Sequence, residues 1–283
     1  MSTMNLALPN GSKIPILHVL PFVLVHVACL SVFLLPFHWY WPVIAVSLYA
    51  VRMFWVTAGY HRYFSHRSFR TSRVFQFILA FLAMSSLQKG VLWWAAHHRH
   101  HHRYSDQEED LHSPSQQGFW WSHVGWILAD SYNHTRQELI PDLYRYPELR
   151  WLNKYHSVPG ITFAVLTFLL GGWSGLVWGF FVSTVMLWHG TFTVNSLAHV
   201  FGRRRYQTTD TSRNSLLLAL ITGGEGWHNN HHHYMTSVRQ GFFWWEIDTT
   251  YYGLKVLSWF GLVWDLKMPP PSLLHPAPAE SNS

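Results

Sequence analysis

The chain has 283 residues, of which 49% are hydrophobic and only 12% charged. Ordinary soluble proteins carry about 25% charged residues, so the composition is that of a membrane protein. The formal net charge of +6 is interpreted as membrane topology and not as nucleic-acid binding. The single cysteine, Cys29, excludes an intramolecular disulfide and a metal site built on cysteine ligands.

Two apolar runs follow a polar stretch at residues 1–13, which we expect to be a loose tail. Residues 14–37 carry no charge and are long enough to cross a bilayer, which takes about 20 residues. An uncharged aromatic turn at residues 38–42 leads into a second run at residues 43–60. The pair predicts a transmembrane hairpin with aromatic residues at its tip.

A third apolar run, residues 74–96, is interrupted by Gln76, Gln88 and Lys89. If it crossed the bilayer, the histidines before and after it would lie on opposite faces and could not share a site. We therefore predict that it lies along the interface, dips into it, or forms a helical hairpin without crossing. Length alone favours the alternative, a genuine span.

A second hairpin is predicted after the polar segment 103–152, which should fold outside the bilayer. Its arms are residues 160–170, extended toward 155, and 176–196, joined by an uncharged glycine-rich turn. Both hairpin tips lack Lys and Arg, so the basic clusters and both termini are expected in the cytosol.

The fold class predicted is thus an all-α integral membrane protein with four transmembrane helices in two hairpins and a cytosolic helical cap. Residues 242–264 are expected to form an interfacial helix. Residues 14–267 are expected to be a single domain, and residues 268–283 a disordered tail.

Histidine is concentrated in three clusters, each next to an apolar run. Five of the six residues 97–102 are His, and the other clusters lie at residues 61–66 and 228–233. The pattern H-x-x-H-H occurs in two of them and H-x-x-x-x-H in the third. Because neutral imidazole is a common ligand for iron, zinc and copper, these clusters predict a metal site.

The spacing predicts which histidines share an ion. Residues i and i+3 share a helix face, so the first two histidines of each H-x-x-H-H pattern are expected to hold one ion, and the third, about 100° away, to reach a second ion. The expected pairs are His98 with His101 and His228 with His231. His61 and His66 lie five residues apart, which is poor for one face of a continuous helix, so we expect the helix to end or bend between them.

A nitrogen-rich dinuclear iron centre fits this ligand set, because zinc hydrolases use fewer ligands and the motif H-E-x-x-H is absent. Zinc is not strictly excluded by sequence. Apolar surroundings favour redox chemistry with dioxygen on an apolar substrate. A different class of function, a membrane metal transporter or sensor, would place polar residues within the spans, where His26 and His189 are found.

Four segments resemble the membrane-bound acyl-CoA (stearoyl-CoA, delta-9) fatty acid desaturases. The resemblance covers roughly residues 49–264. It rests on GYHRYFSHRS at residues 59–68, HRHHHRYSD at 98–106, NSLAHVFG at 195–202 and GGEGWHNNHH at 223–232. The N-S-x-A-H element separates this family from the alkane and sterol-type hydroxylases.

The resemblance implies nine iron ligands and a set of supporting residues. The implied ligands are His61, His66, His98, His101, His102, His199, His228, His231 and His232. Asn195 is implied to hold one iron through a water. His112, Asp106, Asp110 and Glu225 are expected beside the ligands, the three acids orienting imidazoles. His97, His100 and His233 are extra histidines and are not expected to be ligands.

The activity implied is insertion of a cis double bond, at delta-9, into a saturated long-chain acyl thioester, using two Fe²⁺ ions, O₂ and two electrons. The alternative is a di-iron hydroxylase of alkyl chains or lipids. The chain has no nucleotide-binding motif, so a separate reductase and an electron carrier, a ferredoxin or b-type cytochrome, are implied. The short length suggests a bacterial inner-membrane enzyme.

Two further hypotheses concern the substrate. Tyr49 and Met53 precede His61 on a similar helix face and are expected to close the far end of the acyl tunnel. Basic residues near the cytosolic mouth are candidates for contacting the phosphates of a head group. These are Arg70, Arg73, Lys89 and Arg99.

Overall fold

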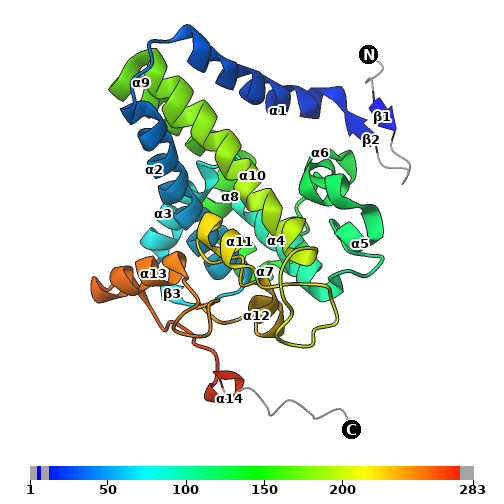
Figure 1. Cartoon of the computed structure of the whole chain (residues 1–283). Helices are drawn as coiled ribbons and strands as arrows, with labels where there is room; N and C mark the ends of the chain where they lie inside the picture. The colour runs from blue at the N-terminus through cyan, green and yellow to red at the C-terminus, as the bar shows by residue number, and fades with distance from the viewer. Residues whose placement is uncertain (1–4, 8–12, 275–283) are drawn as a thin grey trace.

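The computed structural model describes residues 5–7 and 13–274, and helices make up most of it (Figure 1). The described strands are very short and form two antiparallel pairs. These are β1 (Asn5–Ala7) with β2 (Lys13–Pro15) and β3 (Arg70–Thr71) with β4 (Val263–Trp264). The described part of the N-terminal tail is thus a small hairpin, and the rest of it lies outside the described residues.

The first two apolar runs are helical. The first forms α1 (Ile16–Cys29) and the 3₁₀ helix η1 (Leu30–Leu34). The second forms α2 (Tyr40–Trp55), which continues without a break into a π-helix, η2 (Val56–Ser65). Together α2 and η2 make one 26-residue helix that is long and apolar enough to cross a membrane.

The second predicted hairpin is a 42-residue helical stretch, Val158–His199, that is also apolar enough to cross a membrane. It consists of α9 (Val158–Ser174), the π-helix η6 (Gly175–Val182), α10 (Ser183–Asn195) and the 3₁₀ helix η7 (Leu197–His199). Gly172 interrupts it with φ 58° and ψ −147°, and the chain folds back there. A Cβ on Gly175 would lie 2.2 Å from the carbonyl oxygen of Thr167, so the close return requires glycine.

The run at residues 74–96 is divided into two helices, α3 (Arg73–Met84) and α4 (Val91–Tyr104). Leu87 and Lys89 have positive φ angles in the turn between them. At 1.5 Å per residue the 12 residues of α3 extend about 18 Å, less than the ~30 Å of a hydrocarbon core. Both helices pack on η2, so the stretch forms a helical hairpin.

Short helices surround this bundle. Between α4 and α9 they are α5 (Pro114–Gln117), η3 (Trp121–Gly125), α6 (Trp126–Leu128), η4 (Asp130–Tyr132), η5 (Gln137–Leu139), α7 (Pro141–Tyr144) and α8 (Pro147–Lys154). After η7 come α11 (Leu216–Ile221), α12 (His228–His233), α13 (Thr249–Trp259) and α14 (Pro271–Leu274). Of residues 242–264, which are expected to form one interfacial helix, only α13 is helical.

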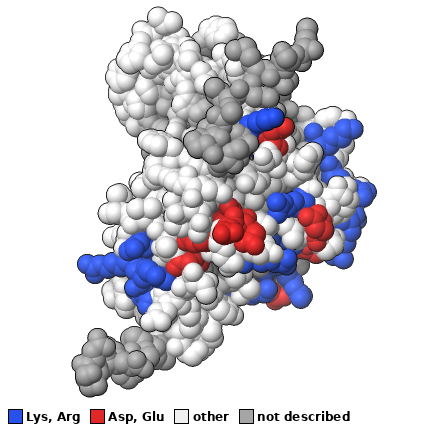
Figure 2. All heavy atoms as spheres, turned by 90° about the vertical axis from the view of Figure 1, so that its right-hand side faces the viewer, with Lys and Arg blue, Asp and Glu red and all other residues white. Residues whose placement is uncertain are grey.

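The C-terminal tail differs from the expectation of disorder, because α14 is helical and Tyr206 Oη donates to the carbonyl of Leu273 at 2.7 Å. Residues 275–283 lie outside the described part. Charge is unevenly distributed: on the face drawn in Figure 2, the charged side chains of the described residues lie in the middle and lower parts, and the top of the molecule shows none.

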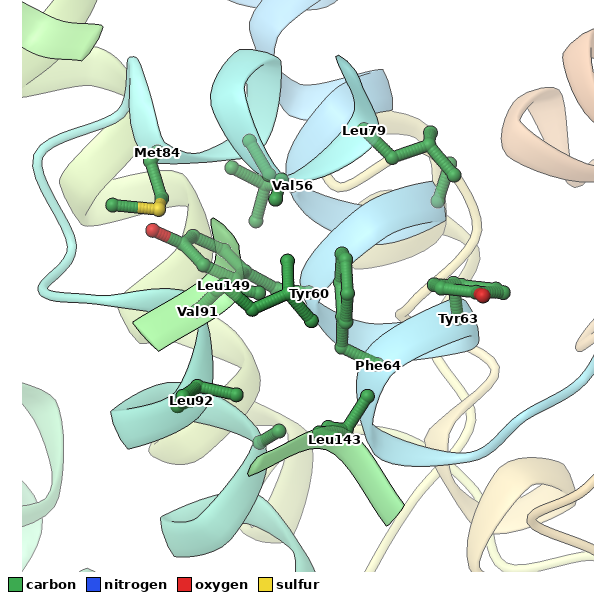
Figure 3. Close-up of a cluster of buried hydrophobic side chains, with 14 of the residues drawn as sticks. Val56, Tyr60, Tyr63, Phe64, Leu79, Met84, Val91, Leu92, Leu143 and Leu149 are labelled. Atoms are coloured by element: carbon green, nitrogen blue, oxygen red, sulfur yellow. The ribbon is translucent and has the colours of Figure 1, made fainter. Parts of the chain in front are cut away.

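The main core joins η2 to α3, α4, α7 and α8 (Figure 3). Tyr60, Phe64, Leu79, Leu92 and Leu143 are fully buried in it. Tyr60 also stacks on Trp94 of α4 with 5.3 Å between the ring centroids. This packing fixes η2 against α4, and these two elements carry the first two histidine clusters.

Candidate metal centre

Nine histidines from η2 and the residue after it, α4, η7 and α12 meet in two adjacent groups. In each group the ring nitrogens lie within 4.8 Å of one another. The first group contains His61, His66, His98, His102 and His231, and the second contains His101, His199, His228 and His232. These are the nine residues that the family resemblance implies as ligands.

The nitrogen spacing fits a bound ion. Nε2 of His98 lies 2.9 Å from Nε2 of His66 and 3.0 Å from Nε2 of His102, and Nε2 of His228 lies 3.1 Å from Nε2 of His199. Two ligands about 2.1 Å from one ion and at right angles to each other lie about 3.0 Å apart. All nine side chains are nitrogen donors, so the donor set suits iron, and the residues fit a dinuclear centre.

Four carboxylates face the Nδ1 atoms of four of these histidines. The contacts are His61 with Glu225 at 2.6 Å, His101 with Asp110 at 2.9 Å, His199 with Asp106 at 3.2 Å and His232 with Asp210 at 2.6 Å. A carboxylate that accepts the Nδ1 proton leaves the Nε2 lone pair free for a metal. The acids therefore fix the tautomer and the ring orientation.

Burial keeps most of the cluster uncharged. Desolvation, together with neighbouring histidines, holds the pKa values of His66, His98 and His102 well below the usual range. Although burial also opposes its charged form, the carboxylate of Asp110 raises the pKa of His101. Burial raises the pKa of Asp110, but the facing His101 outweighs it and the net shift is downward. The site thus offers neutral imidazoles balanced by ionised acids.

The predicted pairing of histidines within each H-x-x-H-H pattern is wrong. His98 shares its group with His102, and His228 with His232, while His101 and His231 lie in the opposite groups. Residues i and i+4 differ by about 40° around a helix, and residues i and i+3 by about 60°. The histidines four apart therefore converge better on one point.

Of the two expected alternatives, the helix ends between His61 and His66 and does not bend there. It widens into η2 and ends at Ser65, and the amide of His66 donates to the carbonyl of His61 at 3.2 Å. This i to i+5 bond is the π-helical pattern, and it brings two residues five apart onto one face. Their rings lie 4.7 Å apart.

Sequence reasoning missed Asp210 and Gln240. Asp210 lies 22 positions before His232 and in no histidine cluster. Gln240 Nε2 lies 3.2 Å from Nδ1 of His61 and 3.4 Å from Nδ1 of His231, so it links the two clusters. Neither position follows a motif, and only the fold brings them to the site.

The extra histidines have other partners. His97 Nδ1 donates to the carbonyl of Trp93, His100 Nε2 donates to that of Glu109, and His233 stacks on Tyr206. His112 stacks on His101 with ring centroids 4.2 Å apart, and burial lowers its pKa to about 3. His112 and Asp110 form a third possible ligand group with His101.

A cavity of about 660 Å³ reaches the first histidine group. His98, His112 and Asn195 line it, and its walls are mostly apolar residues of α1, α4, α6 and α10, including Trp93 and Phe22. A cavity of this size and polarity suits a chain-like apolar substrate.

Of the four basic residues predicted to lie near the cavity mouth, only Lys89 lines the cavity. Its Nζ lies 2.7 Å from Oδ1 of Asn133. The other three face carboxylates: Arg70 with Asp265, Arg73 with Glu148 and Arg99 with Asp142.

Tyr49 and Met53 are not among the residues that line this cavity. Both pack on Gly190, where an added Cβ would lie 2.7 Å from Tyr49 Oη and 2.9 Å from Met53 Cε. The next residue, Thr191, lines the cavity.

Comparison with known proteins identifies the family. The fatty acid desaturase family model matches residues 16–256. An sn-1 stearoyl-lipid 9-desaturase of Anabaena variabilis is 36% identical over 94% of this chain and 98% of its own length. An acyl-CoA 5-desaturase of Anemone leveillei is 38% identical over 86% and 77%, and delta-9 acyl-lipid desaturase 1 of Arabidopsis thaliana is 36% identical over 87% and 81%. The chain belongs to the fatty acid desaturase family and is a fatty acyl desaturase, an oxidoreductase of lipid metabolism.

Proposed function

We propose that this enzyme inserts a cis double bond at delta-9 of a saturated long-chain acyl group carried as a thioester or a lipid ester. The observation that carries the proposal is the joining of the nine-histidine cluster to the apolar cavity through His98. The names of the relatives support an acyl-CoA or acyl-lipid substrate, and delta-9 recurs among them.

The nine histidines are proposed to hold two iron ions in their two groups, with Asn195 holding a water on one of them. Two Fe²⁺ ions bound there supply the activation of O₂ that removal of hydrogen from unactivated methylenes requires. The chain itself orients the imidazoles through the facing carboxylates. Trp93 and Trp94 line the cavity beside His98 and are proposed to keep water from it.

The cavity is proposed to fix which carbons lie beside the metals, because a bound acyl chain is measured from a held head group. Lys89 and Asn133 are proposed to hold that head group, since Lys89 carries the positive charge of the lining.

Tyr49 and Met53 are proposed to close the far end of the acyl path, through Gly190. Met53→Ala and Tyr49→Ala should then shift the preferred chain length upward, as measured on a series of saturated substrates. An unchanged preference would contradict the assignment.

The proposed topology has four spans in two hairpins, with the helical cap, the metal centre and both termini in the cytosol. The charge-free tips and the separation of charge in Figure 2 support it. Residues 14–267 would then form one domain, and this domain would lie in a bacterial inner membrane. The two electrons are proposed to come from a ferredoxin or a b-type cytochrome and its reductase.

Expression in a host that cannot make unsaturated fatty acids tests the proposal, with double bonds located by mass spectrometry of the lipids. A cis-9 monoene should appear and should be lost on His101→Ala and on His231→Ala. Glu148→Gln, at the exposed ion pair with Arg73, is the matched control and should retain it. An alcohol product, or no lipid change with a working electron carrier supplied, would contradict desaturation at this centre.

A further inference from the structure

A second hollow, of about 580 Å³ and open to solvent, lies directly after the long helical stretch that ends at His199. It is formed where the chain leaves η7 and returns to α11, next to the end of α10. Its lining combines basic and apolar residues: Phe201, Gly202, Arg203, Arg204, Arg205, Asn214, Ser215, Leu216, Leu217 and Trp227.

The basic side of the hollow has unused hydrogen-bond donors. Arg205 is paired with Glu246, and one Nη of Arg204 donates to the carbonyl of Thr208 at 2.7 Å. The Arg203 guanidinium has no side-chain partner recorded among the described residues, and no acidic residue belongs to the lining. Two guanidinium groups therefore remain available for an anion, and their planar donors match phosphate oxygens.

The other side is apolar and exposed. Leu216 is 50% exposed, Leu217 59% and Phe201 54%, and Leu220 continues the same surface along α11. Apolar side chains this exposed beside the end of an apolar helix are placed to meet lipid tails and not water. An acidic soluble protein would use the arginines but would leave these leucines without a partner.

We propose that this hollow binds an anionic glycerophospholipid, with its phosphate on Arg203 and Arg204 and an acyl chain along Leu216 and Leu217. The proposal goes beyond the desaturation activity and concerns a lipid that is not the substrate. Basic pockets at the cytosolic ends of spans suit such head groups because charge and apolar contact act together.

Backbone and side-chain contacts link the hollow to the metal centre. Arg203 forms an antiparallel bridge with Asn214, which forms another with Trp227. The Asn214 side chain is paired with Asn230, at 2.6 Å between Nδ2 and Oδ1. Trp227 lines the hollow and is followed by His228. A lipid that fixes this segment should therefore help to retain the ions held by α12, because binding to the native state stabilises it.

The test uses the purified full chain in detergent and native mass spectrometry with dioleoyl phosphatidylglycerol, dioleoyl phosphatidylcholine and inorganic phosphate. We expect the anionic lipid to bind at least tenfold more tightly than the zwitterionic one. Arg203→Ala with Arg204→Ala should abolish that preference, while Arg145→Ala with Arg150→Ala, which removes two exposed arginines elsewhere, should keep it. Leu216→Ser with Leu217→Ser should weaken binding of the lipid only.

Should the double alanine variant fail to accumulate, Arg203→Gln alone carries the same test. Iron content after dialysis, with and without phosphatidylglycerol, gives a readout that needs no turnover. Equal binding of the two lipids by the wild type, or a preference unaltered in the arginine variants, overturns the proposal. Inorganic phosphate that binds as tightly as the lipid also overturns it. So does a result in which the arginine variants keep the lipid preference and lose only activity with an acidic electron carrier. Loss of lipid preference with desaturation intact separates this site from the catalytic one.

Discussion

The carboxylates behind the histidines decide what each imidazole can do. A histidine whose Nδ1 proton is accepted by Asp106, Asp110, Asp210 or Glu225 presents Nε2 as a lone pair. The acid at Glu225 is itself held by Arg62, which is fully buried and also bonds Asp248. Orientation of the ligands thus depends on a buried network of charges that extends beyond the histidines.

Asp210→Asn tests this dependence at one residue. The amide keeps the shape of the side chain but loses the charge that holds the Nδ1 proton of His232, 2.6 Å away. We expect a loss of about 10–100-fold in metal affinity or activity, the usual effect of removing such a partner. Iron per chain, measured by mass spectrometry after dialysis against graded chelator, reads the affinity directly. Asp265→Asn, at the exposed pair with Arg70, is the control, and equal iron retention in the two variants would contradict the role of Asp210.

The family resemblance of the sequence brought the nine histidines and three of the four acids together before the fold did, because these residues belong to motifs or to the acidic stretch beside one. Asp210 could not be predicted, since its contact with His232 arises when the loop after η7 folds back over α12. The division of the histidines into two groups could also not be predicted from the spacing of the histidines in the sequence. It depends on the side-chain directions of α4 and α12, which a count of spacings does not give.

Among the elements, η2 has the most demanding geometry. Its π-helical turn places His61 and His66 together, and it packs so closely on α3 that little room is left for a side chain at Gly59. A Cβ at Gly59 would lie 3.1 Å from the Cβ of Ala83 and 3.2 Å from the carbonyl oxygen of Leu79. The π-helix was not predictable, because apolar periodicity identifies a helix but not a one-residue widening within it.

Gly59→Val should therefore push η2 away from α3. Overpacking of this kind costs about 1–3 kcal/mol of the free energy of unfolding, and the shift is transmitted to His61 two residues on. We expect a lower unfolding midpoint and a reduced iron content. Gly59→Ala provides the graded comparison, since its single methyl makes only tight contacts, and should lie between wild type and valine. A valine variant with the stability and iron content of the wild type would show that the η2–α3 contact accommodates the larger side chain.

In the molecule as a whole, the metal centre joins parts of the chain that are distant in sequence. His61 and His231 are 170 positions apart, yet their Nε2 atoms lie 3.0 Å from each other. Without an ion, facing lone pairs in a buried site have no partner, which is costly. The bound ions should therefore contribute to global stability as well as to chemistry.

Removal of iron should lower the unfolding temperature of the whole protein. A ligand that binds only the native state and is present at 1,000 times its Kd adds about 4 kcal/mol to the free energy of unfolding. We expect the unfolding temperature, measured by tryptophan fluorescence, to fall by several degrees after reduction and chelation of the iron. Addition of Fe²⁺ should restore it. A variant lacking His101 and His231 should show no such response. An unchanged midpoint in the chelated wild type would mean that the fold closes without the ions.

Topology is the property of the whole molecule that charge predicts most directly. The two turns expected outside, residues 38–42 and 171–175, carry no Lys or Arg, whereas Arg203, Arg204 and Arg205 follow the last predicted span at once. Alkaline phosphatase, which folds only outside the cytosol, should be active when inserted at Gly172, where the backbone turns and space is open. The same reporter at Gly118, in an open turn of the cap, should be inactive. Adding three lysines to residues 171–175 should reduce the phosphatase activity at Gly172, because this turn would then compete with the three arginines for the cytosolic side. Activity at both insertion sites would place the cap and the metal centre outside, where no cytosolic electron carrier could reach them.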